Sequence, residues 1–168
     1  GMSERTAASF ADAFAVAAKT GGNVILCDNI TLADFTEPAH TATVTLKAAN
    51  NAKLTLTGTY TLAGETVFDE VTVTAAGAVL DAAGGKLVVN AAAKIAGKPD
   101  VVGTAELYAG DFGKVTATGE LSLVVAGASV DTVTGGATTA RIELASGKIG
   151  TVKSTDAKLD NFILTVTD

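Results

Sequence analysis

Apolar residues recur every three or four positions near the start of the chain and every second position after it. The first pattern covers residues 4–20 and forms one stripe: Ala7, Phe10, Ala11, Phe14, Ala17 and Ala18. This spacing gathers apolar side chains on one face of an α-helix. Ser3 is a suitable N-cap, and Gly21-Gly22 ends the segment. We expect one helix, packed on the open end of the structure that begins at Asn23.

The alternation after Gly22 predicts short β-strands separated by turns. The expected strands are Val24–Cys27, Thr43–Leu46, Leu54–Thr57, Val67–Thr74, Val79–Leu80, Leu87–Asn90, Glu106–Ala109, Leu121–Val125, Ile142–Ala145 and Phe162–Thr167. Turn signals between them include Ala76-Gly77, Gly84-Gly85 and Gly135-Gly136. The principal strands begin roughly 20 residues apart, close to the shortest solenoid repeats. The longer step between residues 44 and 71 predicts a looped-out insertion around Thr59–Glu65.

One phrase, a glycine followed by an apolar residue and then a valine three positions on, occurs three times in the second half. Its apolar pairs are Phe112/Val115, Val130/Val133 and Ile149/Val152. An antiparallel sandwich would show Asn-Gly or Asp-Gly hairpin turns, and neither dipeptide occurs. Recurrence in one direction instead favours a parallel β-solenoid, in which Phe112, Val130 and Ile149 lie above one another.

Composition agrees with a narrow β-structured interior. The chain has 168 residues, enough for one domain with a sizeable core. Hydrophobic residues make up 48% of it, but aromatic residues only 5%, and there is no Trp. Thr and Val are abundant, and β-branched side chains pack well on a pleated surface.

The Ala-rich opening helix, the segment Gly21-Gly22-Asn23-Val24-Ile25-Leu26 and the phrase Leu80 to Leu87 carry a family resemblance. The chain resembles the right-handed parallel β-helix proteins of the pectin-lyase-like superfamily, especially glycine- and threonine-rich surface proteins of gut bacteria. The resemblance implies an all-β, single-domain right-handed parallel β-helix of about seven or eight coils. Residues 3–20 would form the capping helix and residues 21–168 the β-helix. It also implies an extracellular or cell-surface location.

Charge and cysteine content exclude several partners. The net charge is −6, and the basic residues are scattered, so we expect no nucleic-acid partner. No apolar run is long enough to insert in a membrane. Cys27 is the only cysteine, and we expect it to be a small buried hydrophobe. One Cys and one His cannot form a structural zinc site, and no cofactor motif is present. The single histidine, His40, is expected in a solvated loop.

Two features at the N-terminus bear on export. The stretch from Ala7 to Ala18 is similar to a signal sequence, but Asp12 interrupts it and Glu4 offsets Arg5. We therefore expect this stretch to be the helix rather than a signal peptide. Gly1 ahead of Met2 is typical of a residue left by tag removal.

Carboxylates are the candidate catalytic groups, because the superfamily's enzymes act on sugar acids with Asp, Arg or Lys. The Asn-Thr-Asp segment and the Asp-Asp pair of its hydrolases are missing, as is the nonapeptide calcium repeat. Asp69 and Glu70, the only adjacent acidic pair, should point to opposite faces of a strand. Arg141 and Glu143 should share a face, where a surface ion pair is the simplest explanation. If the protein is an enzyme, the candidates are Asp69, Asp111, Arg141 and Glu143.

Three functions therefore remain open. The sequence favours a non-catalytic structural or adhesive module that binds a carbohydrate or protein ligand on a β-face. The first alternative is a polysaccharide lyase or hydrolase acting on sugar acids. The second is an ice-binding solenoid, because six Thr-x-Thr segments could form ladders. These segments are Thr43/Thr45, Thr55/Thr57, Thr72/Thr74, Thr116/Thr118, Thr132/Thr134 and Thr165/Thr167.

The last strand is strongly apolar, and no capping helix follows Phe162-Ile163-Leu164. An uncovered final coil leaves unpaired backbone groups, which proteins normally hide. We expect loop packing, self-association or a further domain to cover this end.

Overall fold

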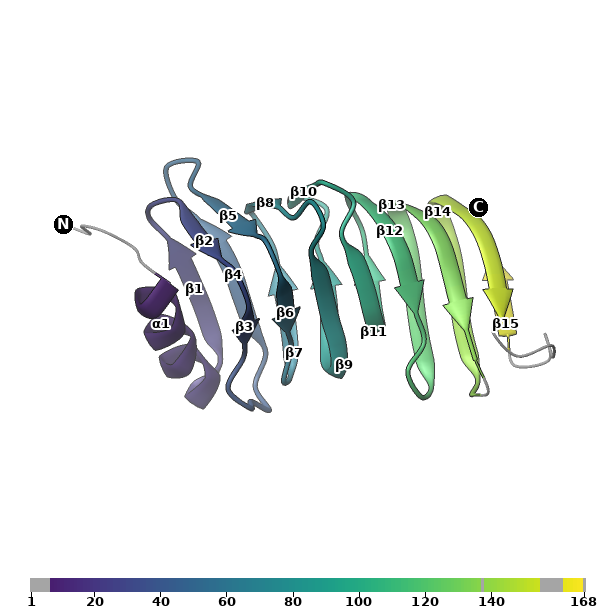
Figure 1. The fold of residues 1–168 in the computed structure, drawn as a ribbon, viewed down its shortest axis with the longest axis horizontal. Coiled ribbons are helices and arrows are strands. Elements are labelled where there is room, and N and C mark those ends of the chain that lie inside the picture. The colour runs from purple at the N-terminus through teal and green to yellow at the C-terminus, as the bar shows by residue number, and fades with distance from the viewer. Residues whose placement is uncertain (1–6, 137, 155–161, 168) are drawn as a thin grey trace.

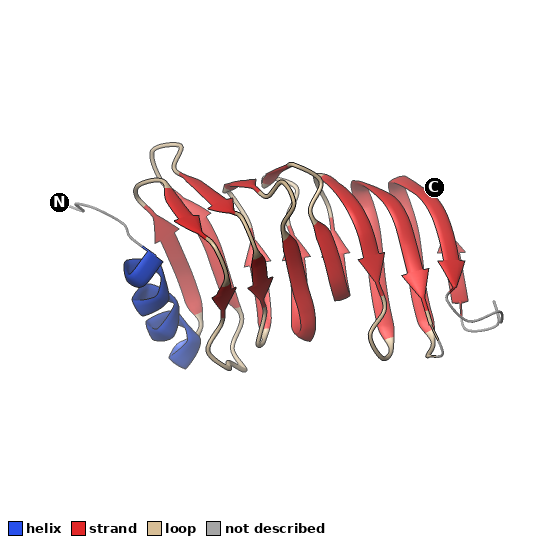
Figure 2. Cartoon of the chain, in the orientation of Figure 1, coloured by secondary structure: helices blue, strands red, loops and turns tan. Residues whose placement is uncertain are grey.

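The computed structural model describes residues 7–136, 138–154 and 162–167, and these form a parallel β-solenoid of about 7 coils with one helix at its N-terminal end (Figures 1 and 2). The elements are α1 (Ala7–Thr20), β1 (Gly22–Leu26), β2 (Ile30–Leu32), β3 (Phe35–Thr36), β4 (Val44–Ala48), β5 (Lys53–Leu56), β6 (Thr59–Thr61), β7 (Glu65–Phe68), β8 (Thr72–Thr74), β9 (Val79–Val89), β10 (Lys94–Ala96), β11 (Asp100–Leu107), β12 (Asp111–Thr116), β13 (Leu121–Gly135), β14 (Ala140–Ser154) and β15 (Phe162–Val166). We call one circuit of the chain a coil.

Every strand pairing in the described residues is parallel. The longest side of the solenoid runs from β1 to β15, and we call its outward surface the broad face. Strands β9, β11, β13 and β14 bend at a corner, so each contributes to more than one side. A second side consists of β2, β5, β8 and β10.

Side chains stack in columns because parallel strands keep the same register from coil to coil. One inward column of the broad face is Val24, Leu46, Phe68, Val89, Leu107, Val125, Leu144 and Val166. A column on another side is Phe35, Tyr60, Leu80, Val101, Val115, Val133 and Val152. The core is therefore a set of short aliphatic stacks, which explains why few aromatic residues suffice.

The repeated phrase of the second half supplies residues of two inward columns. Phe112 is opposite Val130, and Val130 is opposite Ile149. The predicted vertical alignment of the three residues is confirmed. The valines three positions further on, Val115, Val133 and Val152, form the neighbouring column.

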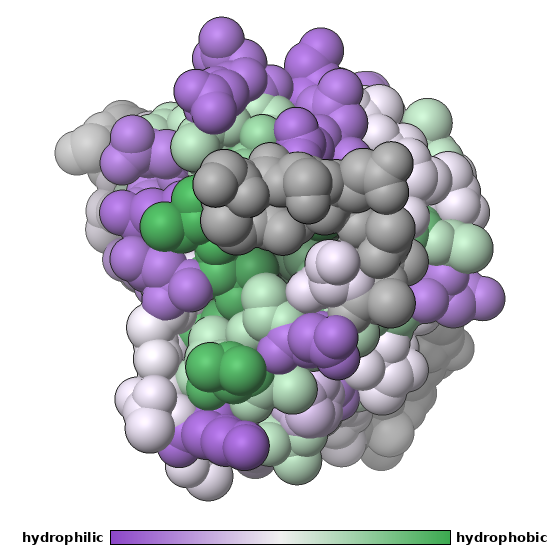
Figure 3. Space-filling model, turned by 90° about the vertical axis from the view of Figure 1, so that its left-hand side faces the viewer, coloured by the Kyte–Doolittle hydropathy of each residue, from purple (hydrophilic) through white to green (hydrophobic). Residues whose placement is uncertain are grey.

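Helix α1 closes the N-terminal end of the solenoid. Its apolar stripe faces the first coil, and Phe10 and Phe14 are 1% and 0% exposed. Both rings contact Phe35, with centroids 5.0 and 5.9 Å away. Burying a phenylalanine contributes about 1.5–3 kcal/mol, so the two rings hold the helix in place. Figure 3, which views this end, shows apolar residues scattered among hydrophilic ones.

Several predicted boundaries are wrong. The segment Thr59–Glu65 is not a looped-out insertion, because Thr59–Thr61 is β6 and pairs with both β3 and β9. The expected strand Val67–Thr74 is broken by a corner between β7 and β8. Gly84-Gly85 lies inside β9 rather than in a turn. The proposed N-cap, Ser3, lies outside the described residues.

The expected strands do not include β2, β3, β10 or β12, although the repeated phrase did place Phe112 and Val115 of β12 in the stack. These strands are short and each contributes only one or two inward residues, too few for a period of two to stand out. Within the described part of the chain, no helix has the length and apolarity needed to cross a membrane.

The columns predict that an interior aromatic residue is costly to remove. Phe112→Ala should lower the free energy of unfolding by about 3–5 kcal/mol, because Phe112 is 0% exposed and stacks against Val130. Urea unfolding followed by circular dichroism measures this change. The control Val16→Ala, at a position 68% exposed on α1, should change stability by less than about 0.5 kcal/mol. Equal effects of the two substitutions would contradict the column model.

Candidate functional site

The four candidate residues do not form one site. Asp69 follows β7, and its carboxylate lies 3.5 Å from Lys47 Nζ and accepts a hydrogen bond from Asn90. Asp111 is the exposed first residue of β12 and lies opposite Ser129. Arg141 and Glu143 are both on β14, further along the solenoid. Only the last two share a strand, as their spacing predicts.

The adjacent acidic pair is placed differently from the expectation. Asp69 and Glu70 lie at the corner after β7, not on a strand, so the alternation argument does not apply to them. Both carboxylates approach Lys47 Nζ, at 3.5 and 4.0 Å. Their charges are partly neutralised by one partly exposed cation, and an ordinary surface interaction accounts for them.

Arg141 and Glu143 border a shallow depression on the broad face. Its volume is about 280 Å³, and β13, β14 and β15 supply its lining. Arg141 lies opposite Ser122 and Ile163, and Glu143 lies opposite Val124 and Thr165. Both charged side chains are exposed, and the depression therefore combines hydrogen-bond donors, acceptors and an aliphatic floor.

The outward column of the broad face brings two carboxylates near each other. Glu106 is opposite Val124, and Val124 is opposite Glu143. Two strand spacings separate their backbones by about 10 Å. Sequence reasoning did not single out Glu106, because its position relative to Glu143 depends on a register that no motif reveals.

Glu106 is held by two neighbours on the same face. Lys86 Nζ forms an ion pair with it, and the Tyr108 hydroxyl donates a 2.9 Å hydrogen bond to its other oxygen. The hydrogen bond from Lys86 is the main reason that the pKa of Glu106 is lowered. The same contact raises the pKa of Lys86, and the hydrogen bond to Glu106 raises the pKa of Tyr108. We call Glu106, Tyr108, Arg141 and Glu143 the broad-face patch.

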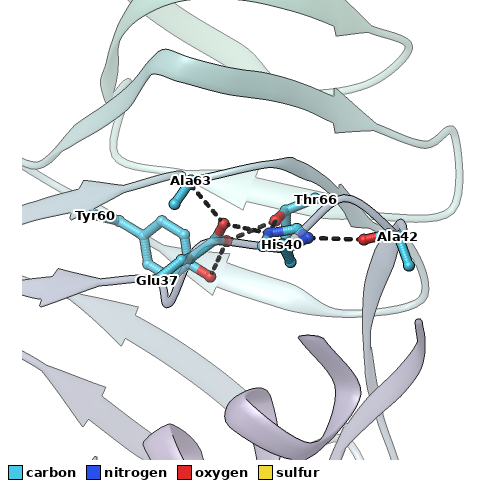
Figure 4. Close-up of polar contacts among 6 residues, drawn as sticks. All are labelled: Glu37, His40, Ala42, Tyr60, Ala63 and Thr66. Carbon is cyan, nitrogen blue, oxygen red and sulfur yellow. Dashed lines mark hydrogen bonds and ion pairs between the residues drawn. The ribbon is translucent and has the colours of Figure 1, made fainter. Parts of the chain in front are cut away.

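His40 is buried, so the prediction of a solvated loop histidine is wrong. It is 7% exposed and lies in the connection between β3 and β4, where it meets Glu37, which is 3% exposed (Figure 4). Its Nε2 lies 2.8 Å from Glu37 Oε1, and its Nδ1 lies 2.7 Å from the carbonyl oxygen of Ala42. A carbonyl oxygen can only accept, so Nδ1 carries a proton.

The Glu37 carboxylate receives four donors. The Ala63 amide donates to Oε1 at 3.0 Å, beside His40 Nε2. The Tyr60 and Thr66 hydroxyls donate to Oε2 at 2.8 and 2.6 Å. His40 Nε2 and Glu37 Oε1 are thus in direct contact at 2.8 Å, and every polar atom of the two side chains has a hydrogen-bond partner. Burial, followed by the charge of Glu37, raises the pKa of Tyr60 well above its usual value.

This buried cluster does not have the geometry of a catalytic triad. In a triad the nucleophile and the carboxylate contact different nitrogens of the histidine. Here Thr66 and Glu37 both lie against Nε2, at 3.5 and 2.8 Å, and Nδ1 is bound to the backbone. Thr66 is also 0% exposed. The cluster instead ties the first two coils together beneath α1, whose Phe14 ring packs on His40.

Gly64 provides the space for this arrangement. A Cβ at position 64 would lie 2.3 Å from the His40 carbonyl oxygen and 2.7 Å from its ring, too close for any other residue. The sequence signals available were the three-residue spacing of Glu37 and His40 and the glycine at 64. Neither indicates burial without knowledge of the coil length.

Cys27 and the Thr-x-Thr segments are the other features singled out in the sequence. Cys27 is half-buried and directly follows β1, so the prediction that it is a buried hydrophobe is wrong. Threonines do stack at Thr31, Thr55 and Thr74 on the second side, but Ala96 ends that column. The neighbouring column, Lys53, Thr72 and Lys94, is mostly charged. The described strands thus offer no long flat threonine array there.

Comparisons with known proteins add no information on the family or function of the chain. No protein-family model matches the sequence, and no curated protein or solved structure is significantly similar to the chain. Within the described residues, no group of three or more His, Cys, Asp and Glu side chains could hold a metal ion.

The buried pair predicts a clear effect of removing one acceptor oxygen. Glu37→Gln should lower the free energy of unfolding by about 1–3 kcal/mol, because a carboxamide has one acceptor oxygen where Glu37 offers two to its buried partners. Urea unfolding measures the change, and Glu70→Gln, with a side chain 70% exposed, is the control with little effect. His40 is the only histidine, so its ring nitrogens are assigned without ambiguity in nitrogen NMR spectra. An unprotonated Nδ1 in the wild type would contradict its hydrogen bond to the Ala42 carbonyl oxygen.

The ion pair between Lys86 and Glu106 predicts a small, pH-dependent contribution to the free energy of unfolding. The pKa of Glu106 is lowered from 4.5 in the folded state. The ion pair with Lys86 therefore stabilises the fold above pH 4.5, and this stabilisation is lost as the pH falls through the folded pKa of Glu106. Lys86→Ala should therefore cost less than about 1 kcal/mol near neutral pH. In acid, below the folded pKa of Glu106, the difference between variant and wild type should disappear. A difference that persists in acid would assign the effect to packing of the Lys86 side chain.

Proposed function

We propose that the protein is a non-catalytic β-solenoid module that binds a carbohydrate on its broad face. The observation that carries the proposal is the broad-face patch: an aromatic ring, a guanidinium and two carboxylates around the aliphatic Val124 on one continuous sheet. Sugars are recognised by such combinations, because hydroxyls need both donors and acceptors and ring faces pack on aromatic and aliphatic carbon.

The distribution of charge favours a neutral glycan over a strongly acidic one as the ligand of the broad-face patch. The net charge of −6 repels polyanions at long range. Within the patch the two carboxylates outnumber the one guanidinium, and Lys86 is already paired with Glu106. Exposure on a solenoid side also suits an extended chain that lies across several strands. The resemblance to surface proteins of gut bacteria supports a role outside the cell.

A hydrolytic role is the second candidate, because Glu106 and Glu143 lie about 10 Å apart along one column, near the separation in inverting glycosidases. Such an enzyme needs one carboxylic acid whose pKa is raised. Lys86 and Tyr108 instead lower the pKa of Glu106. The depression is also shallow and open, so water is not excluded from it. These features favour binding without catalysis.

The test is a glycan array followed by titration of the best ligand. Arg141→Ala and Glu143→Ala should each weaken binding about tenfold or more, because a hydrogen bond to a charged group contributes about 1.5–3 kcal/mol. Lys148→Ala is the matched control: it is also exposed on β14 but lies opposite Ser129, away from the patch, and should leave binding unchanged.

Two outcomes would overturn the proposal. Binding that survives both patch substitutions would place the ligand elsewhere. Release of reducing sugars, or of unsaturated uronides detected by ultraviolet absorbance, would show catalysis. Loss of that activity in Glu106→Gln and Glu143→Gln would then assign the hydrolytic role to the two carboxylates.

A further inference from the structure

A second hollow lies at the corner where the broad face meets the second side, and we call it the corner notch. Its volume is about 280 Å³, and its polar lining consists of Asn51, Glu70, Thr72 and Lys94. These residues come from three successive coils and lie around the connections from β4 to β5, from β7 to β8 and from β9 to β10. The corner notch is therefore separate from the depression on β13, β14 and β15.

Unequal connection lengths create the notch. The connections from β4 to β5 and from β9 to β10 are residues 49–52 and 90–93, whereas the connection from β7 to β8 is only residues 69–71. The middle coil therefore turns the corner with one residue fewer than its two neighbours. Asn51 and Lys94 belong to the two flanking coils, about two strand spacings or 10 Å apart. Val71, which is 4% exposed, lies on the middle coil between them.

The polar side chains of the notch are not used to hold the fold together. Within the part of the chain that the structure describes, the side chains of Asn51, Thr72 and Lys94 form no hydrogen bond or ion pair. Glu70 lies 4.0 Å from Lys47 Nζ, and its side chain is 70% exposed. An amide, a hydroxyl, an ammonium and a carboxylate group thus offer both donors and acceptors to a ligand.

The charge and the size of the notch select one neutral sugar ring. One carboxylate and one ammonium group line it, so neither sign of charge dominates. Its volume lies at the lower end of the range for ligand pockets, which suits a single ring rather than a larger molecule. The hydroxyls of a ring need donors and acceptors on several sides, and the methyl groups of Ala52 and Ala92 offer contact to its carbon atoms.

A column of polar side chains connects the corner notch with the broad-face patch. Asn90 directly follows β9, and Tyr108 directly follows β11, and these two strands pair in register up to their last residues. Asn90 and Tyr108 are therefore neighbours on successive coils. On the other side, Asn90 donates a 3.3 Å hydrogen bond to Asp69, in the middle connection of the notch. The patch therefore begins on the coil next to the notch.

We propose that the corner notch is a second sugar-binding subsite, which holds one neutral pyranose ring of the glycan that crosses the broad-face patch. Lys94 donates a hydrogen bond to one ring hydroxyl, Glu70 accepts one from another, and the Asn51 amide does both. The proposal rests on the glycan function proposed above. From the notch to Glu143 is about four strand spacings, or about 20 Å, so the ligand is an oligosaccharide.

The first test follows the backbone amide signals of the full chain by NMR during titration with glucose, galactose, mannose and N-acetylglucosamine. At least one of these neutral sugars should shift the signals of Asn51, Val71 and Thr72, with a Kd on the order of 1–10 mM. The amide of Val124 reports on the broad-face patch in the same spectrum. The two sites are therefore measured separately on the unaltered protein.

Two matched pairs of substitutions test the lining. Lys94→Met should weaken sugar binding at the notch about tenfold or more, because it removes a charged donor. Lys53→Met is its control, since Lys53 lies on the other side of Thr72 in the same column but does not line the notch. Asn51→Gly should weaken binding about fivefold. Its control is Asn50→Gly, because both asparagines have a φ of 56°, which glycine tolerates, and only Asn51 lines the notch.

The spectra separate failure of the subsite from failure of the broad-face proposal. Notch signals that none of the four sugars shifts, or shifts that survive both Lys94→Met and Asn51→Gly, would overturn the subsite. Shifts at the notch alone would support the subsite and overturn binding at the broad-face patch. Shifts at the patch alone would support the patch and overturn the subsite.

A chain-length series tests whether one ligand reaches both sites. The probes are linear oligosaccharides of two to six units of the sugar that shifts the notch signals. The hexasaccharide should bind about tenfold or more tightly than the disaccharide, because it contacts both sites at once, and Lys94→Met should remove that gain. Equal affinities of the two oligosaccharides would overturn the shared ligand.

Discussion

Parallel pairing at a nearly constant coil length is the constraint on which the whole molecule depends. Once each strand pairs in register with the one before it, the side chains at equivalent positions must stack, and the inward columns must be mostly apolar. The stack from Val24 to Val166 shows the consequence for the interior. The same rule orders the exterior, where it sets Glu106 and Glu143 in one column with only Val124 between them.

The Glu37–His40 pair, with Thr66, is the main polar cluster buried in the described core. The connection from β3 to β4, residues 37–43, is longer than the corresponding connection from β6 to β7, residues 62–64, and it folds inward under α1. Its polar groups then need partners, which Tyr60, Thr66 and the Ala63 amide provide. Burying these polar groups costs desolvation free energy, but their hydrogen bonds fix the shape of the surface on which α1 packs. The conformation of the N-terminal end therefore depends on hydrogen bonds as well as on the burial of apolar side chains.

The sequence predicted what depends on local periodicity: the helix, the parallel stacking and the alignment of Phe112 with Val130 and Ile149. It did not predict what depends on register across coils. His40 looks like a loop residue because its neighbours are Ala39 and Thr41, while its partners Glu37 and Thr66 are brought together only by the turn of the chain. Glu106 was missed for the same reason, since its relation to Glu143 exists only across Val124.

The charges on the broad face favour the proposed binding function over acid–base catalysis. Catalysis by two carboxylates needs unequal environments, one that holds a proton and one that does not. On an open sheet both groups face water, and here the neighbours Lys86 and Tyr108 favour the charged form of Glu106. Raising its pKa would require a wall that excludes water, and the residues that line the depression beside Arg141 all belong to strands. These features support the proposed binding function rather than a hydrolytic one.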